Sequence, residues 1–175
     1  PIMNMKLKKD DEVIGISLTE PGKESLLFVT EKGLTLKYPV TEVSATGLKS
    51  QGVKAMNVKA DDKLVFGGLI PETGNLVTVS NRGAVKRTTL DTFETGARAQ
   101  VGSMLYKDIK SKPHRIVAAS VTGAGKDQTI EIMSETHAHT LRANEVRLSG
   151  KYSNGSFVVE EETFGIVTDA HFSAL

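Results

Sequence analysis

The sequence predicts an all-β fold made of consecutive blade-like units, and three observations lead to this prediction. Short blocks of similar sequence recur every 49 to 51 residues along the chain. Apolar and polar residues alternate with a period of two, as they do in half-buried strands. No window of about 12 residues combines the 3.6-residue period of an amphipathic helix with capping residues. Repeats of roughly 40–50 residues with about four strands each are typical of blades around an axis, and a solenoid is the alternative architecture.

Three pairs of similar blocks define the repeat: 10–14 with 61–65, 27–33 with 77–83, and 46–51 with 95–100. A weaker third copy begins at Arg115 and continues through 129–134. The chain is therefore interpreted as one repeat domain, or a fragment of one, over residues 1–175. Its predicted units are 10–60, 61–110 and 111–163, and residues 164–175 open a further blade or form a closing strand.

Each unit is predicted to contain a tight β-hairpin. Residues 34–38 and 84–88 alternate as strands, and each follows an apolar run that ends in a turn. Gly33 and Gly83 lie in those turns, where glycine supplies the positive φ that a tight hairpin needs. His137 occupies the corresponding place in the third unit. Short helical turns are expected only near 90–93 and 143–146.

The amino-acid composition excludes several classes of protein. The 175 residues include 22 Lys and Arg against 21 Asp and Glu, no Cys, and only 5% aromatic residues. The absence of cysteine excludes disulfides and thiolate metal sites. No apolar run approaches the roughly 20 residues that span a bilayer. The Lys-rich residues 1–10 lack the apolar segment of a signal peptide. A net charge of +1 also argues against a uniformly basic DNA-binding domain.

The charges are nevertheless sorted within each repeat. Residues 10–27 have a net charge of −4 and residues 28–60 of +3. Residues 61–78 have −2 and residues 79–110 have +3, so the alternation recurs. Equivalent segments of a blade array occupy equivalent places, and the basic halves are therefore expected to form one band. Such a band attracts a polyanion even when the total charge is near zero. Ordinary solvated charge is the alternative interpretation.

The repeated blocks resemble a known family. Residues 27–33, Lys37 and the glycine-containing loop that ends at 52–57 resemble the repeat of the C-terminal domains of bacterial type IIA topoisomerase A subunits, those of gyrase and topoisomerase IV. Residues 81–87 resemble the same hairpin in the next blade, and residues 111–116 are similar to the Gram-positive topoisomerase IV version. The resemblance extends over roughly residues 10–160 and is weakest in the third repeat.

This resemblance implies a β-pinwheel, a propeller-like ring whose blades exchange strands, with about three blades present here. It also implies duplex DNA as the partner, bound and bent without catalysis and presented to the N-terminal cleavage domain of the same polypeptide. The B subunit of topoisomerase IV would complete an ATP-dependent isomerase that decatenates and relaxes DNA. No cofactor is expected in this chain, since ATP and Mg²⁺ would bind elsewhere in the enzyme, and no membrane partner is expected. The implied location is the bacterial cytoplasm, at the nucleoid.

In gyrase the first blade carries a box with the sequence Gln-Arg-Arg-Gly-Gly-Lys-Gly, which DNA wrapping requires. The matching stretch here, residues 46–52, keeps little more than Gly52, and the second copy at 96–102 also departs. This departure favours topoisomerase IV over gyrase, or else indicates that only later blades are present. The candidate phosphate-binding side chains are Lys32, Lys37, Lys49, Lys54, Arg82, Lys86, Arg87, Arg98, Arg142, Arg147 and Lys151.

Two other functional classes are alternatives to a DNA-binding domain. One is a blade-type scaffold for protein partners that does not bind DNA. The other is a repeat-fold enzyme built on His137 and His139, which would lie on one face of a strand but lack a third metal ligand at a suitable spacing. None of Tyr38, Tyr106 and Tyr152 follows an arginine, as a DNA-cleaving tyrosine would in this family. Residues 123–126 lack the upstream glycine of a phosphate-binding loop. The acidic run 160–162 is interpreted as a segment that repels DNA.

Overall fold

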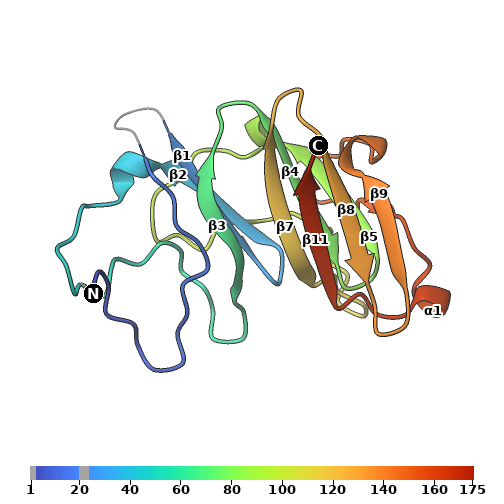
Figure 1. The fold of residues 1–175 in the computed structure, drawn as a ribbon, viewed down its shortest axis with the longest axis horizontal. Coiled ribbons are helices and arrows are strands. Elements are labelled where there is room, and N and C mark those ends of the chain that lie inside the picture. Colours follow the sequence, from blue (N-terminus) through green and yellow to red (C-terminus); the bar gives the residue numbers. More distant parts are fainter. Residues whose placement is uncertain (1–2, 20–23) are drawn as a thin grey trace.

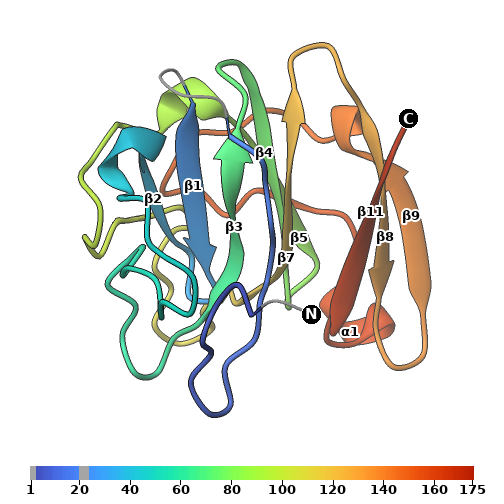
Figure 2. The ribbon, with the colours of Figure 1, turned by 60° about the vertical axis from the view of Figure 1, so that its left-hand side comes forward.

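The computed structural model describes residues 3–19 and 24–175, and it is built almost entirely from antiparallel β-strands. The strands form three small sheets that lie side by side like blades (Figures 1 and 2). The predicted all-β fold is therefore confirmed. Within the described residues, no helix is both long and apolar enough to cross a membrane.

Each sheet contains a hairpin, which is central in the first two sheets and includes an edge strand in the third. The first sheet has the order β3-β1-β2-β6, the second β10-β5-β4-β7 and the third β11-β8-β9. The strands of the first sheet are β3 (Leu64–Ile70), β1 (Ser25–Thr30), β2 (Leu34–Pro39) and β6 (Ser103–Met104). Those of the second are β10 (Ser156–Phe157), β5 (Ala84–Thr89), β4 (Gly74–Ser80) and β7 (Ile116–Gly123). Those of the third are β11 (Asp169–Ala174), β8 (Gln128–Met133) and β9 (Ala138–Arg142).

Neighbouring repeats exchange strands. The β1–β2 hairpin belongs to the first sequence repeat, but both its flanking strands, β3 and β6, come from the second. The second sheet takes β7 and β10 from the third repeat in the same way. Residues 169–174 form β11, which pairs with β8 at the corresponding edge of the third sheet. This exchange is the β-pinwheel arrangement that the family resemblance implies.

The turns of the hairpins follow the sequence signals. Gly33 has φ +89° and Gly83 has φ +77°, so both adopt the left-handed conformation predicted for them. A Cβ at Gly83 would also lie 2.4 Å from Cγ2 of Val159, which leaves no space for a side chain. The helical turns predicted near 90–93 and 143–146 form as η2 (Leu90–Thr92) and η3 (Ala143–Glu145). A third 3₁₀ turn, η1 (Val40–Glu42), occupies the equivalent place in the first repeat, and α1 (Glu161–Phe164) is a single α-helical turn.

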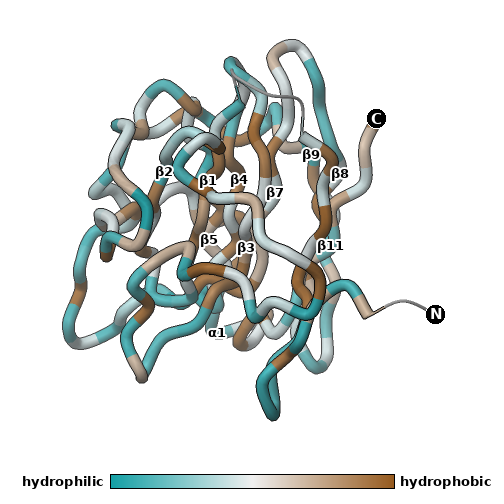
Figure 3. The backbone as a smooth tube through the Cα atoms, turned by 90° about the vertical axis from the view of Figure 1, so that its left-hand side faces the viewer, coloured by the Kyte–Doolittle hydropathy of each residue, from teal (hydrophilic) through white to brown (hydrophobic). Residues whose placement is uncertain are grey.

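The apolar core lies between the sheets rather than on one side of them (Figure 3). Leu27 and Val29 of the first sheet pack with Leu76 of the second, whereas Val77 and Val79 pack with Ile130 of the third. Adjacent residues of β4 therefore point to opposite neighbours, as the pleat of a strand requires. Since the middle sheet is buried on both faces, the charged side chain of Lys86 in β5 is also buried.

Candidate nucleic-acid interface

Three turns with the same backbone conformation recur along one edge of the array. We call residues 46–52, 96–102 and 149–155 the first, second and third rim turns. In each, a non-glycine residue adopts a left-handed conformation and a left-handed glycine follows three positions later. The residue–glycine pairs are Lys49 (φ 66°) with Gly52 (78°), Ala99 (65°) with Gly102 (87°), and Tyr152 (59°) with Gly155 (73°).

Two of the rim turns lie beside an edge strand. The second and third turns lead directly into β6 and β10, which are the edge strands of the first and second sheets. At the opposite edge of each sheet are β3, β7 and β11, and β7 packs against both β3 and β11 (Figure 1). The inner strands thus hold the blades together, while the turns form the outer perimeter.

Backbone hydrogen bonds join the three turns into one row. The N–H of Ala99 donates to the carbonyl of Ala55 at 3.0 Å, and the N–H of Tyr152 donates to that of Leu105 at 2.9 Å. A second pair of bonds repeats the relation: Asn57 donates to Gln100 at 2.8 Å and Lys107 to Ser153 at 3.3 Å. The segment after each turn therefore supports the tip of the next, and the row has a fixed geometry.

Four of the predicted basic residues present free side chains on or beside this row. Lys49, Lys54 and Arg147 are exposed, and their side chains make no hydrogen bond or ion pair with the described part of the chain. Lys151 is partly exposed, and its Nζ lies 5.7 Å from the centre of the Tyr152 ring. These cations can reach a polyanion without breaking a hydrogen bond or an ion pair.

Two other predicted cations link neighbouring blades. Lys37 of the first sheet donates from Nζ to the carbonyl of Leu90 at 3.1 Å, in the 3₁₀ turn of the second repeat. Arg87 occupies the equivalent position of the second sheet and donates from Nη1 to the carbonyls of Asn144 and Val146, at 3.3 and 3.1 Å, in the third. Each cation thus donates to backbone carbonyls in or beside the 3₁₀ turn of the next repeat. Their positive charge is engaged in holding the array together.

The remaining side chains of the predicted set also have partners within the protein. Lys32 donates to Asp61 and so lowers the pKa of that exposed carboxyl, mainly through the hydrogen bond. Arg98 donates from Nε to the carbonyl of Glu42 at 3.0 Å and from Nη1 to that of Lys54 at 2.6 Å. Arg142 is exposed but pairs with Asp127 at 2.9 Å.

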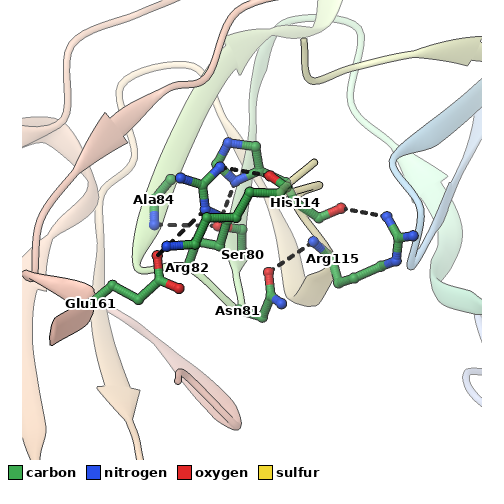
Figure 4. A network of polar contacts seen from close by, with 8 residues as sticks. Ser80, Asn81, Arg82, Ala84, His114, Arg115 and Glu161 are labelled. Atoms are coloured by element: carbon green, nitrogen blue, oxygen red, sulfur yellow. Dashed lines mark hydrogen bonds and ion pairs between the residues drawn. The ribbon is translucent and has the colours of Figure 1, made fainter. Parts of the chain in front are cut away.

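Arg82 belongs to a polar network beneath the hairpin of the second sheet (Figure 4). Its Nε lies 3.5 Å from a carboxylate oxygen of Glu161, and its Nη1 donates to the carbonyl of Lys112 at 2.8 Å. Within the same network, Ser80 Oγ contacts Nδ1 of His114 at 3.0 Å. Glu161 thus neutralises Arg82, and the acidic run 160–162 has a structural partner.

The prediction that Lys86 binds DNA phosphates is corrected by its position. Its side chain is completely buried and donates to the carbonyls of Gly150 and Ser153 and to the Ser153 hydroxyl. Burial lowers the pKa of Lys86 to about 8. The ammonium therefore holds the third rim turn against the second sheet, and it is not accessible to a ligand.

The third rim turn departs from the block spacing of the first two repeats. Its residues follow those of the second turn by 53 positions, instead of the 49 to 51 that separate the earlier blocks. A pair of glycines in the sequence does identify the third turn. Gly150 and Gly155 are separated by five positions, as are Gly47 and Gly52 in the first turn. The spacing of the earlier blocks assigns no equivalent to Lys151. In the third rim turn it occupies the position that Leu48 has in the first turn and Arg98 in the second.

The residues of the enzymatic alternative do not gather into a site. His137 and His139 are exposed, and Nδ1 of His137 contacts the hydroxyl of its neighbour Thr136 at 2.8 Å. Among residues 3–19 and 24–175, no three His, Asp or Glu side chains are grouped to hold a metal ion. Tyr38 is buried and donates to the carbonyl of Ala55 at 3.0 Å, and burial raises the pKa of Tyr38 to about 12. Such a phenol is a poor nucleophile.

Comparison with known proteins assigns the chain to a family. Residues 1–20, 24–70 and 74–122 match the family described as DNA gyrase C-terminal domain, beta-propeller. The A subunit of DNA topoisomerase 4 from Staphylococcus epidermidis is 36% identical over 167 residues, which are 95% of this chain and 21% of that protein. Its counterpart from Staphylococcus aureus MRSA252 is 35% identical over 174 residues, 99% of this chain and 21% of the relative. The chain thus spans about a fifth of the length of the curated relatives it matches.

Two solved structures share the fold. The crystal structure of the C-terminal domain of DNA topoisomerase IV matches 98% of this chain and 53% of that chain, with a TM-score of 0.87 and 36% identity. The DNA gyrase A C-terminal domain matches 85% of this chain and 50% of that chain, with a TM-score of 0.70 and 23% identity, a likeness in fold alone. With its exchanged strands and repeated rim turns, the chain belongs to the family of DNA gyrase C-terminal domains.

Proposed function

We propose that this chain binds and bends duplex DNA without catalysing a reaction, as part of a type IIA topoisomerase A subunit. The observation that carries the proposal is the continuous row of rim turns with free cations at Lys49, Lys54, Arg147 and Lys151. A row of cations along one edge neutralises phosphates and releases their condensed counterions. Contacts of this kind position DNA without reading its sequence.

Bending follows from the shape of the perimeter. A duplex that keeps contact with successive turns has to follow the edges of successive blades. Smooth bending of a 20–30 bp site by 40–90° costs roughly 1–6 kcal/mol, which the added phosphate contacts can offset. The fixed spacing of the turns supports this, because the backbone bonds between them prevent the protein from flattening onto straight DNA.

We infer further that the whole polypeptide is the A subunit of topoisomerase IV. The supporting observations are the topoisomerase IV relatives at 35–36% identity and the departure of residues 46–52, 96–102 and 149–155 from the gyrase box. In that enzyme the domain would present a DNA segment to the N-terminal cleavage domain for decatenation and supercoil relaxation. The B subunit, ATP and Mg²⁺ would act elsewhere in the assembly, and the enzyme would work at the bacterial nucleoid.

Ligation of a nicked circular plasmid in the presence of the protein tests this function. A domain that binds and bends duplex DNA changes the writhe of the circle, so that the closed products shift in linking number on an agarose gel. Direct binding of a labelled duplex at about 50 mM salt provides the companion measurement, since electrostatic binding is strongest at low salt. Absence of duplex binding under those conditions would contradict the proposal and favour a protein-interaction scaffold.

A further inference from the structure

Two of the three rim turns carry a large apolar side chain at the tip. Leu48 is 64% exposed in the first turn, and Tyr152 is 61% exposed in the third. Each lies next to a free cation, Lys49 or Lys151. At the tip of the second turn are Arg98, which is held by two carbonyls, and the small residue Ala99. The row therefore has an apolar tip at each end and none between them.

Internal packing does not account for these two side chains. Leu48 belongs to none of the apolar clusters between the sheets, and the Tyr152 hydroxyl has no hydrogen-bond partner in the described part of the chain. Tyr152 also adopts a left-handed backbone conformation that disfavours a bulky residue. Aromatic residues are scarce here, and Tyr152 is the most exposed of those described. Strain and exposure together at one residue suggest a function.

The surroundings of Tyr152 leave room for a ligand. Tyr152 and Lys151 line a groove of about 770 Å³ whose other wall includes Gln100 and Gly102 of the second rim turn. Residues 35–37 and 92–96 also line the groove, so it is bounded by the first sheet and by the second and third rim turns. A chain of phosphates bound by Lys49 and Lys151 would carry the sugars and base edges of the duplex past both apolar tips.

We propose that Leu48 and Tyr152 enter a groove of the bound duplex and bury their apolar surface against sugars and base edges, with Lys49 and Lys151 on the flanking phosphates. Proteins that deform DNA often place apolar side chains in a groove beside basic ones. This inference rests on the proposed DNA-binding function and adds to it two contact points, separated by the second turn, that localise the bend.

Duplex affinity measured against salt concentration separates apolar contacts from phosphate contacts. Replacing both tips, Leu48→Ala with Tyr152→Ala, is expected to weaken binding roughly tenfold at every salt concentration, because apolar burial is lost and no charge is removed. The slope of log K against log salt stays unchanged. The matched pair Lys49→Ala with Lys151→Ala is expected to reduce the magnitude of that slope by about 1.8. Denaturation curves of both double variants should match that of the parent protein.

Two single variants define the part played by Tyr152. Tyr152→Phe keeps the ring and is expected to bind like the parent; a loss as large as that of Tyr152→Ala would mean that the hydroxyl binds phosphate, and would overturn the proposal. Tyr152→Gly removes the backbone strain together with the ring, and it is expected to bind as weakly as Tyr152→Ala. Full affinity in the double alanine variant would refute the proposed apolar contacts but leave the proposed DNA-binding function intact. A parent protein that binds no duplex would refute the proposed function itself.

Discussion

The first and second rim turns have the same backbone conformation but differ in what supports them. Lys49 and Ala99 have φ values of 66° and 65°, and each is followed by a left-handed glycine. A Cβ on Gly102 would lie 2.4 Å from the carbonyl oxygen of Thr35, whereas the nearest atom to a Cβ on Gly52 would be Cε of Met5 at 3.9 Å. Arg98 is held by two carbonyls, but Lys49 is free.

This difference follows from position in the array. Each later turn packs on the preceding repeat, and in the second turn Arg98 binds carbonyls at that contact. The first turn has no preceding sheet within the described chain, so its basic residue stays in solvent. A cation in a repeated basic segment therefore contributes to either support or binding, and only its neighbours decide which.

The largest effect is expected from reversing the buried charge at the third turn. Lys86→Glu places a buried carboxylate against the carbonyls of Gly150 and Ser153, where the Ser153 hydroxyl is the one donor among the partners of Lys86. We expect a loss of about 3–5 kcal/mol in the free energy of unfolding, measured by urea denaturation. Lys49→Glu, at the free tip of the first turn, should change it by less than about 0.5 kcal/mol. Equal stability of the two variants would contradict the distinction between a buried supporting cation and a free one.

The two glycines give a matched test of backbone packing. Gly102→Ala combines left-handed strain with a clash against the Thr35 carbonyl, and we expect it to lower the free energy of unfolding by about 3 kcal/mol. Gly52→Ala meets the strain alone, for which about 1 kcal/mol is expected. Equilibrium denaturation of both variants in one buffer measures the difference. A cost at Gly52 as large as that at Gly102 would show that the first turn is packed as tightly as the second.

The stability of the third turn should depend on alkaline pH. Burial lowers the pKa of Lys86 to about 8 from 10.5, so the unfolded chain binds this proton more tightly than the native protein between those values. The free energy of unfolding should therefore rise by about 2 kcal/mol from pH 8 to pH 10 through this group. Lys86→Met should lack that rise, and Lys49→Met should retain it. A parallel pH dependence in all three proteins would contradict the assignment.

A smaller effect distinguishes the basic residues of the first two turns. Arg98→Ala removes the hydrogen bonds to the carbonyls of Glu42 and Lys54 and should destabilise the protein by about 1 kcal/mol. Lys49→Ala should leave stability unchanged and lower the magnitude of the salt slope of duplex binding by about 0.9. Thermal or chemical denaturation and fluorescence anisotropy on the same two variants check both halves. If Lys49→Ala altered stability instead of the salt slope, Lys49 would support the fold and would not bind phosphate.

Local signals in the sequence predict much of the fold. Gly33 and Gly83 mark the hairpins because a positive φ is a requirement of the single residue. The short helical turns at 90–92 and 143–145 are also local, since each is closed by a backbone bond between residues three apart. Strand exchange comes only from the family resemblance, because pairing between repeats depends on contacts distant in the chain.

The site is less predictable, and Lys86 shows why. Alternation along 84–88 distinguishes two faces of a strand but does not say that both are covered. In the second sheet both are, because Ala84 faces the first sheet and Val85 the third, and Lys86 shares the face of Ala84. Its burial therefore depends on the neighbouring blade and not on its own segment. The third rim turn escapes the repeat pattern because additional residues shift its spacing to 53.

The central claim is that the free cations of the rim turns bind DNA phosphates while the tied cations support the array. The most direct test is the salt dependence of duplex binding for the parent protein and for the triple variant Lys49→Ala, Lys54→Ala and Lys151→Ala. We predict that the magnitude of the slope of log K against log salt falls by about 2.7, at roughly 0.9 for each lost phosphate contact. An unchanged slope in a variant with the parent's denaturation curve would contradict the claim.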